Sequence, residues 1–103
     1  MIARIWKGRT LAVQADEYMA YMQTTGVPEL RATEGNCGVY VLRRIDGDQA
    51  EFTFISLWES IAAIRRFAGE EIDRAVYYPE DRRYLLALEP NVVHHEVLVA
   101  DGV

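Results

Sequence analysis

The chain has 103 residues and a formal net charge of −5. This length suits one domain over residues 1–103 with a single hydrophobic core. Because phosphate backbones are bound mainly through lysine and arginine, the acidic balance argues against a nucleic-acid partner.

Neither a membrane span nor a secretory leader is expected. No apolar run approaches the roughly 18 residues that a membrane span requires, and the first residues lack a charged segment followed by an apolar one. We therefore expect a cytoplasmic protein with no membrane partner. The single Cys37 excludes an internal disulfide and a cysteine-rich metal site, and beside Gly38 it is read as a small packed residue.

The first third of the chain predicts a strand and a helix. Residues 1–7 alternate and are rich in β-branched and aromatic side chains, which indicates a strand that ends at Gly8. Residues 15–25 have helical spacing, with acidic residues in the first turn and Gly26 as the expected C-cap. Residues 27–36, with Pro28, are expected to form an ordered connection.

A hairpin follows, with strands at 37–45 and 50–58 joined through Asp46-Gly47-Asp48. Neither face of the second strand is polar: one face carries Phe52, Phe54, Ser56 and Trp58, and the other carries Thr53, Ile55 and Leu57. A single layer of helices covers only one side of a sheet, so the other side needs another cover. We expect a homodimer through this sheet face.

The last third predicts a helix and a strand. Ser60 is a good N-cap, Gly69 is a good C-cap, and the residues between them place an apolar stripe on one face. Residues 70–76 are expected to resume as a short helical piece before Pro79, and the mixed charges at 79–83 indicate a solvated turn. Residues 91–100 predict a fourth strand.

The order strand, helix, strand, strand, helix, strand is the split βαβ pattern of a ferredoxin-like α+β fold with a four-stranded antiparallel sheet. Four stretches then carry a specific resemblance: MIARIWKGR, GNCGVYVLRR, SLWESIAAIRRFAGEEIDRAVYYPED and VVHHEV. They resemble the antibiotic biosynthesis monooxygenase family of dimeric α+β barrels. That superfamily also includes haem-degrading enzymes, cyclase-like and isomerase-like proteins, so the resemblance implies a fold more firmly than an activity.

His95 is the first candidate for proton transfer, because an imidazole titrates near neutral pH and this ring shares a strand face with Val93 and Val97. A packed histidine with one hydrogen bond is the alternative. His94 must point the opposite way in a regular strand, so the pair cannot chelate one metal. With no third histidine and no carboxylate at ligand spacing, we expect neither a metal nor another cofactor.

Aromatic residues are numerous enough to wall a site for a flat apolar or aromatic ligand. The candidates are Trp6, Tyr40, Trp58, Phe67, Tyr77 and Tyr78. Core packing is the alternative for each of them, above all for Phe67. In the monooxygenases, which oxidise aromatic polyketides without a cofactor, tryptophan and tyrosine position the substrate and its phenolate. The resemblance implies such parts for Trp58 and for Tyr77 or Tyr78. We therefore expect Trp6, Tyr40, Trp58 and Phe67 to bind the substrate, and Tyr77 and Tyr78 to act in catalysis beside His95.

The haem-degrading branch fits less well. Those enzymes carry a second tryptophan in the helix after LWES and a haem-ligating histidine ten residues later, where this chain has Phe67 and Tyr77. The sequence therefore favours a small-molecule-binding barrel that acts as a cofactor-independent monooxygenase on an aromatic or polyketide-like compound. A non-catalytic ligand-binding or stress-associated barrel is the alternative, and haem degradation comes third.

Overall fold

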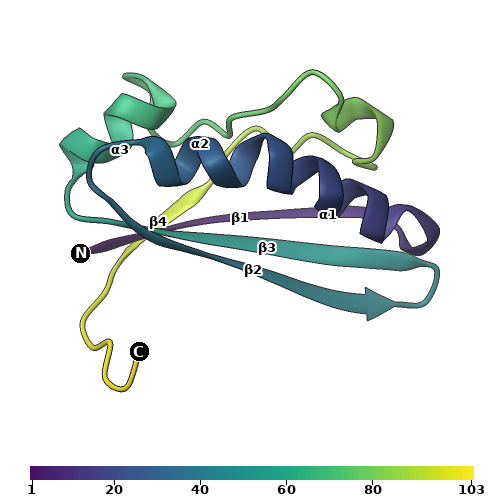
Figure 1. Ribbon diagram of the computed structural model, residues 1–103, viewed down its shortest axis with the longest axis horizontal. Coiled ribbons are helices and arrows are strands. Elements are labelled where there is room, and N and C mark those ends of the chain that lie inside the picture. Colours follow the sequence, from purple (N-terminus) through teal and green to yellow (C-terminus); the bar gives the residue numbers. More distant parts are fainter.

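Four antiparallel strands form one sheet in the order β2-β3-β1-β4 in the computed structural model, which describes residues 1–103 (Figure 1). The strands are β1 (Ile2–Leu11), β2 (Asn36–Asp46), β3 (Gln49–Trp58) and β4 (Val93–Glu96). The helices are α1 (Ala15–Thr24), α2 (Gly26–Ala32) and α3 (Ile61–Ala68), with short 3-10 turns η1 (Ala12–Gln14) and η2 (Asp81–Arg83). This arrangement confirms the ferredoxin-like α+β fold.

Strand β1 does not end at Gly8 but runs on to Leu11. The glycine has a packing role instead, because the indole of Trp6 lies against it. A Cβ atom at Gly8 would lie 2.3 Å from Cη2 of Trp6, which is a severe clash. Gly8, which the sequence indicates as the end of the strand, is therefore the position where the strand leaves room for the Trp6 ring.

The predicted connection at 27–36 is wrong in its first half, because α2 occupies most of it. Thr25, with φ −125° and ψ −82°, separates α1 from α2, and Gly26 opens the second helix rather than capping the first. Pro28 is compatible with this because it lies in the first turn, where its missing N–H has no intrahelical partner to lose. Leu30 is buried and packs α2 against the sheet in a cluster with Trp58.

The hairpin and α3 form where the sequence predicts them. Gly47 adopts φ 63° in the turn between β2 and β3. Ser60 caps α3, since its Oγ accepts a hydrogen bond from the backbone N–H of Ala63 at 3.1 Å, and Gly69 ends the helix with φ 83°. The N-cap and the C-cap each depend on a few neighbouring residues, so the folded chain forms them as the sequence predicts.

No helical piece forms at 70–76, contrary to the prediction. The backbone there pairs across to another segment: Ala75 donates to the carbonyl of Pro90 at 2.9 Å, and Val92 donates to that of Asp73 at 2.8 Å. The fourth strand is also shorter than the predicted 91–100, because β4 finds partners only along residues 2–5 of β1. The C-terminal residues beyond it extend away from the sheet (Figure 1).

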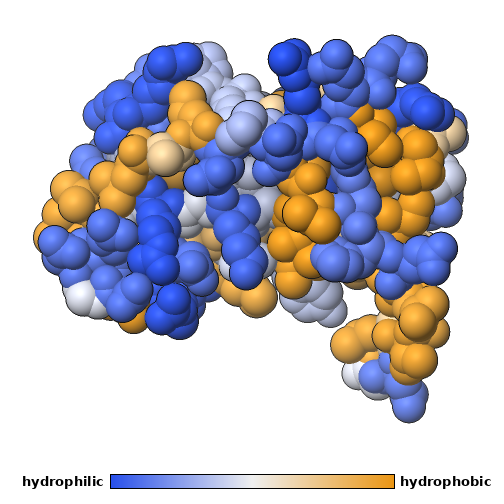
Figure 2. Space-filling view, turned by 180° about the vertical axis from the view of Figure 1, so that it is seen from behind, coloured by the Kyte–Doolittle hydropathy of each residue, from blue (hydrophilic) through white to orange (hydrophobic).

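The two faces of the sheet differ sharply. The inner face, beneath the helices, carries the buried side chains of β3, namely Ala50, Phe52, Phe54, Ser56 and Trp58. The outer face has no covering layer, and Tyr40, Leu42 and Val93 on it are 49%, 49% and 57% exposed. Seen from behind, the surface shows hydrophobic patches between hydrophilic ones, and the projecting C-terminal segment is largely hydrophobic (Figure 2).

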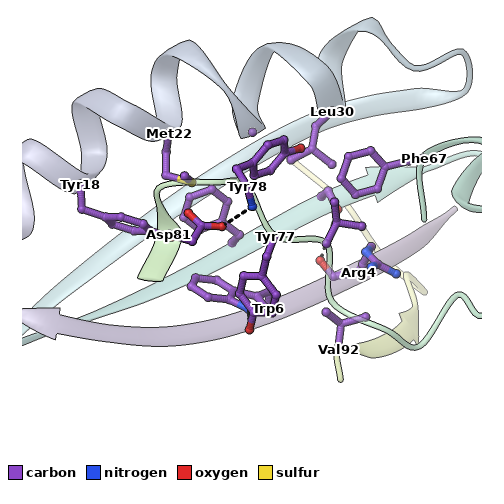
Figure 3. Close-up of a pocket in the computed structure, with 14 residues that line it drawn as sticks. Arg4, Trp6, Tyr18, Met22, Leu30, Phe67, Tyr77, Tyr78, Asp81 and Val92 are labelled. Atoms are coloured by element: carbon purple, nitrogen blue, oxygen red, sulfur yellow. Dashed lines mark hydrogen bonds between the residues drawn. The ribbon is translucent and has the colours of Figure 1, made fainter. Parts of the chain in front are cut away.

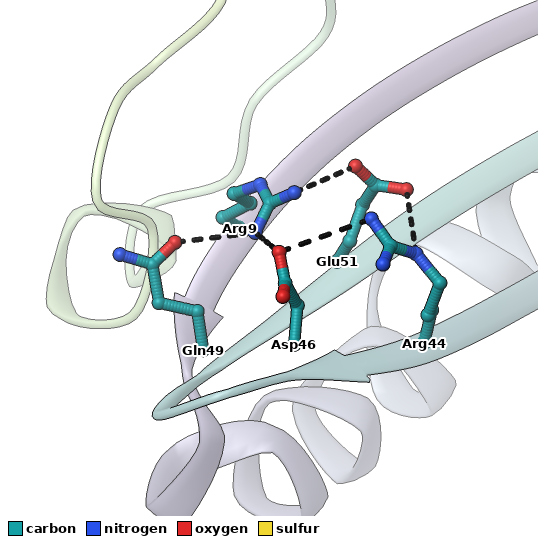
Figure 4. A network of polar contacts seen from close by, with 5 residues as sticks. All are labelled: Arg9, Arg44, Asp46, Gln49 and Glu51. Atoms are coloured by element: carbon teal, nitrogen blue, oxygen red, sulfur yellow. Dashed lines mark hydrogen bonds and ion pairs between the residues drawn. The ribbon is translucent and has the colours of Figure 1, made fainter.

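The hairpin end of the outer face is charged rather than apolar. Arg9 lies 3.1 Å from both Asp46 and Glu51, and Arg44 lies 3.9 Å and 3.8 Å from the same two carboxylates (Figure 4). Gln49 accepts a further hydrogen bond from Arg9 at 3.3 Å. The outer face thus has an apolar half and a charged half.

No helix in the chain combines the length and apolar character that crossing a membrane would require.

Candidate ligand-binding cavity

A cavity of about 60 Å³ lies between the inner face of the sheet, the helices and the segment that follows α3 (Figure 3). Most of its lining is apolar. The lining residues are Arg4, Trp6, Tyr18, Met22, Gly26, Leu30, Phe54, Ser56, Phe67, Val76, Tyr77, Tyr78, Asp81 and Val92. A volume of about 60 Å³ gives room for about four to six water-sized groups, enough for one aromatic ring.

Aromatic rings form much of the wall because β1 and β3 turn their large side chains inward at the same level. The indole of Trp6 meets Phe54 edge to face, with ring centroids 5.5 Å apart, and meets Tyr77 at 6.3 Å. Aromatic walls of this kind suit flat apolar ligands.

The hydroxyl of Tyr77 is fully engaged. It accepts a hydrogen bond from Nε1 of Trp6 at 3.1 Å and donates to the carbonyl oxygen of Glu89 at 2.5 Å. Burial raises the pKa of Tyr77, which favours the neutral phenol. In this arrangement the phenol holds the indole in place, and its proton is already donated to a backbone carbonyl.

Two other polar groups of the wall lack partners. Oδ2 of Asp81 accepts a hydrogen bond from the backbone N–H of Tyr78 at 2.6 Å, whereas Oδ1 is buried and has none. The Tyr78 hydroxyl is likewise buried without a partner. Burial raises the pKa of Asp81, and burial together with the nearby Glu29 carboxylate raises the pKa of Tyr78.

Arg4 supplies the positive charge of the cavity wall. It donates to the backbone carbonyls of Ile72 and Arg74, the latter at 2.7 Å, and its Cζ lies 5.8 Å from the ring centroid of Phe67. Burial lowers the pKa of Arg4 to about 10, although Asp73 opposes the shift. The guanidinium is therefore charged at neutral pH and is held by backbone oxygens.

His94 lies next to Arg4 and is fixed by it. Arg4 can only donate, so the 3.1 Å contact from its Nη1 makes Nε2 of His94 the acceptor. The ring proton is then on Nδ1, which lies 3.1 Å from the Asp73 carboxylate. Burial and the Arg4 charge lower the pKa of His94, so the ring is neutral in the folded protein.

The cavity brings together four of the residues predicted from the sequence, namely Trp6, Phe67, Tyr77 and Tyr78. Trp58 is fully buried behind the wall, where its Nε1 donates to Oγ of Ser56 at 2.9 Å. Tyr40 and His95 lie on the outer face: Tyr40 is opposite Ile55, and His95 is an exposed residue. The roles predicted for all these residues stay predictions.

Sequence reasoning missed Arg4 and Asp81. Arg4 alternates with apolar residues on the inner side of β1, and a charge at such a position could have marked it. The prediction of a solvated turn at 79–83 is wrong for Asp81, because only 3% of this residue is exposed. Its neighbours Arg82 and Arg83 are exposed, so the turn is split between water and core.

The structure contains no group of three or more histidine, cysteine, aspartate and glutamate side chains placed to hold a metal ion.

The comparisons with solved structures return the same fold. MhuD, a heme-degrader from Mycobacterium tuberculosis with two hemes bound in its active site, is 16% identical over 99% of this chain and 100% of its own, with a TM-score of 0.62. A mutant of MhuD with two manganese protoporphyrin IX groups bound per active site is 16% identical over 100% of both chains, with a TM-score of 0.63. Rv0793 from Mycobacterium tuberculosis is 14% identical over 99% of this chain and 100% of its own, with a TM-score of 0.57.

No curated protein matches the chain. The sequence model described as antibiotic biosynthesis monooxygenase matches residues 1–75, which is most of the chain and includes all but one of the strands. The chain therefore belongs to the antibiotic biosynthesis monooxygenase family.

Proposed function

We propose that this protein is a homodimeric α+β barrel that binds a small aromatic or polyketide-like molecule in the cavity and oxidises it with dioxygen, without a metal or organic cofactor. The observation that carries the proposal is the cavity itself: an aromatic-walled space with buried polar groups on the inner face of the sheet. Such a combination is typical of sites that bind one small molecule in one orientation. Family membership supports the oxidative chemistry.

The homodimer is proposed from the outer face. Ile5, Ile55 and Leu57 lie there beside the exposed Tyr40 and Val93, with no other part of the chain over them. An apolar sheet face of this kind is covered most economically by a second copy, in an interface of obligate type that would bury on the order of 2,000 Å². His95 would then lie at the interface, where its role as a proton-transfer group remains a proposal.

The test is binding followed by oxygen uptake. We expect single-ring phenols such as catechol and hydroquinone to bind and to stimulate oxygen consumption, and we expect Val76→Phe, which fills the cavity, to abolish both. Val13→Phe is the matched control, because Val13 is 91% exposed and lies outside the cavity. Binding without oxygen uptake would favour the non-catalytic alternative, and no binding of any aromatic compound would overturn the proposal.

Haem degradation remains the weaker candidate. A tyrosinate at position 77 could ligate ferric haem, but its hydroxyl is already bonded to Trp6 and Glu89 and its pKa is raised. A cavity of about 60 Å³ is also far smaller than a porphyrin needs. We expect haemin titration to give no tight complex. A stoichiometric complex with a sharp Soret band that is lost in Tyr77→Phe would show that haem is the ligand.

A further inference from the structure

The unpaired oxygen of Asp81 is the feature of the cavity that packing leaves unexplained. The residue is 3% exposed, and its Oδ1 is buried without a hydrogen-bond partner. Such an atom is costly, because water would otherwise solvate it, and native structures rarely leave one unexplained. No arginine or lysine forms an ion pair with this carboxylate.

The backbone holds the carboxyl group so that this oxygen cannot turn to solvent. The N–H of Asp81 donates to the carbonyl of Tyr78 at 3.0 Å, while the N–H of Tyr78 donates to Oδ2 of Asp81 at 2.6 Å. The carbonyl of Asp81 also accepts from Tyr84 and Leu85 at 3.1 Å and 2.9 Å. In Figure 3 the carboxyl group lies between Tyr18, Met22 and Trp6, inside the ring of lining residues.

Capping the turn does not by itself require a carboxylate. One acceptor oxygen is enough for the N–H of Tyr78, and an asparagine would supply it without a second charged oxygen in an apolar site. The second oxygen is therefore the part of Asp81 that calls for a ligand. The ionised carboxylate can only accept hydrogen bonds, so the group that matches it in this form is a donor.

We propose that Asp81 is the polar anchor of the cavity and that the ligand is an aromatic ring, or the ring end of a larger molecule, whose hydroxyl or N–H group donates to Oδ1. This inference rests on the cavity being the ligand site proposed above. Carboxylate ligands are disfavoured by the like charge of Asp81, and cationic ligands by the charge of Arg4 in the same wall.

The test uses p-cresol and p-xylene, which differ only in a hydroxyl in place of a methyl group. Calorimetric titration of the full chain should show p-cresol binding about tenfold or more tightly than p-xylene, the scale expected for one hydrogen bond to a charged group. Equal affinities would leave the cavity as an aromatic site and overturn the role of Asp81. If neither compound bound, the proposed ligand site and this inference would fail together.

Asp81→Asn separates the anchor from the cap. The amide oxygen can still accept from Tyr78, so the melting temperature should not fall, while the preference for p-cresol over p-xylene should drop by about tenfold. Asp101→Asn makes the same change at an exposed position and should keep the preference. An Asp81→Asn protein that retained the full preference would overturn the proposal. The comparison of the two ligands in the unmodified protein decides the matter even if this variant folds poorly.

Discussion

The two faces of the sheet come from the same strands but differ in what covers them. The inner face is complete within one chain: helices cover it, Trp58 and Phe52 are fully buried, and the cavity lies among its aromatic side chains. The outer face ends in an apolar half and a charged half with nothing over them. The comparison teaches that the alternation of one strand can contribute side chains to a core on one side and leave apolar side chains uncovered on the other.

The sharpest way to break this comparison is to make the outer face unfit for a partner. We expect Ile55→Lys to convert a dimer into a folded monomer of 11.8 kDa, because a lysine at the centre of a sheet-to-sheet interface would be buried without a counter-charge. Sedimentation velocity at micromolar concentration measures the change. Val13→Lys, at an exposed position on η1, should leave the dimer intact. An unmodified protein that is already monomeric would refute the dimer.

The second test compares one aromatic residue from each face. Trp58→Ala removes a fully buried side chain and should lower the free energy of unfolding by about 3–5 kcal/mol. Tyr40→Ala should lower the free energy of unfolding by less than half of this amount, because Tyr40 is half exposed to water in the monomer. Both variants are measured by urea denaturation in the Ile55→Lys background. Equal losses would mean that the outer face is packed within one chain.

The adjacent histidines sharpen the comparison further. His94→Ala removes the contacts to Arg4 and Asp73 and should lower the free energy of unfolding by about 1–3 kcal/mol at any protein concentration. The effect of His95→Ala should instead depend on protein concentration, since this residue faces the proposed partner. Thermal melts over a hundredfold range of concentration would distinguish them, and identical behaviour of the two variants would contradict their assignment to opposite faces.

The smallest expected effect is the pH dependence of His94. Its pKa is lowered by burial and then by Arg4, so the unfolded chain takes up a proton at this ring near pH 6.5 whereas the folded chain stays neutral to lower pH. The stability that depends on the neutral ring is thus present above pH 6.5 and is lost as the pH falls through the lowered pKa. The gap in unfolding free energy between the unmodified protein and His94→Ala should therefore narrow from pH 7.5 to 5.5. Parallel curves of unfolding free energy against pH would show that protonation of His94 does not change the stability.

Local signals were enough for much of the fold. Ser60 and Gly69 bound α3, Gly47 makes the hairpin turn, and the alternation through Phe54 and Ile55 separates the faces, because each of these depends on a few neighbouring residues. The same alternation showed that His94 and His95 point opposite ways. Ferredoxin-like topology then followed from the order of the elements.

Only the tertiary structure decided how these pieces meet. Pairing of Arg4 with His94, rather than with its neighbour, turns His94 toward the helices and leaves His95 on the outer face. Contact with β1 along four residues limits β4, and pairing with 90–92 replaces the predicted helix at 70–76. Asp81 is buried because its turn folds back over α1, where Glu80 donates its N–H to the Tyr21 hydroxyl at 3.0 Å. Long-range contacts of this kind leave no periodic trace in the sequence, so the anchor of the cavity emerges only once the chain is folded.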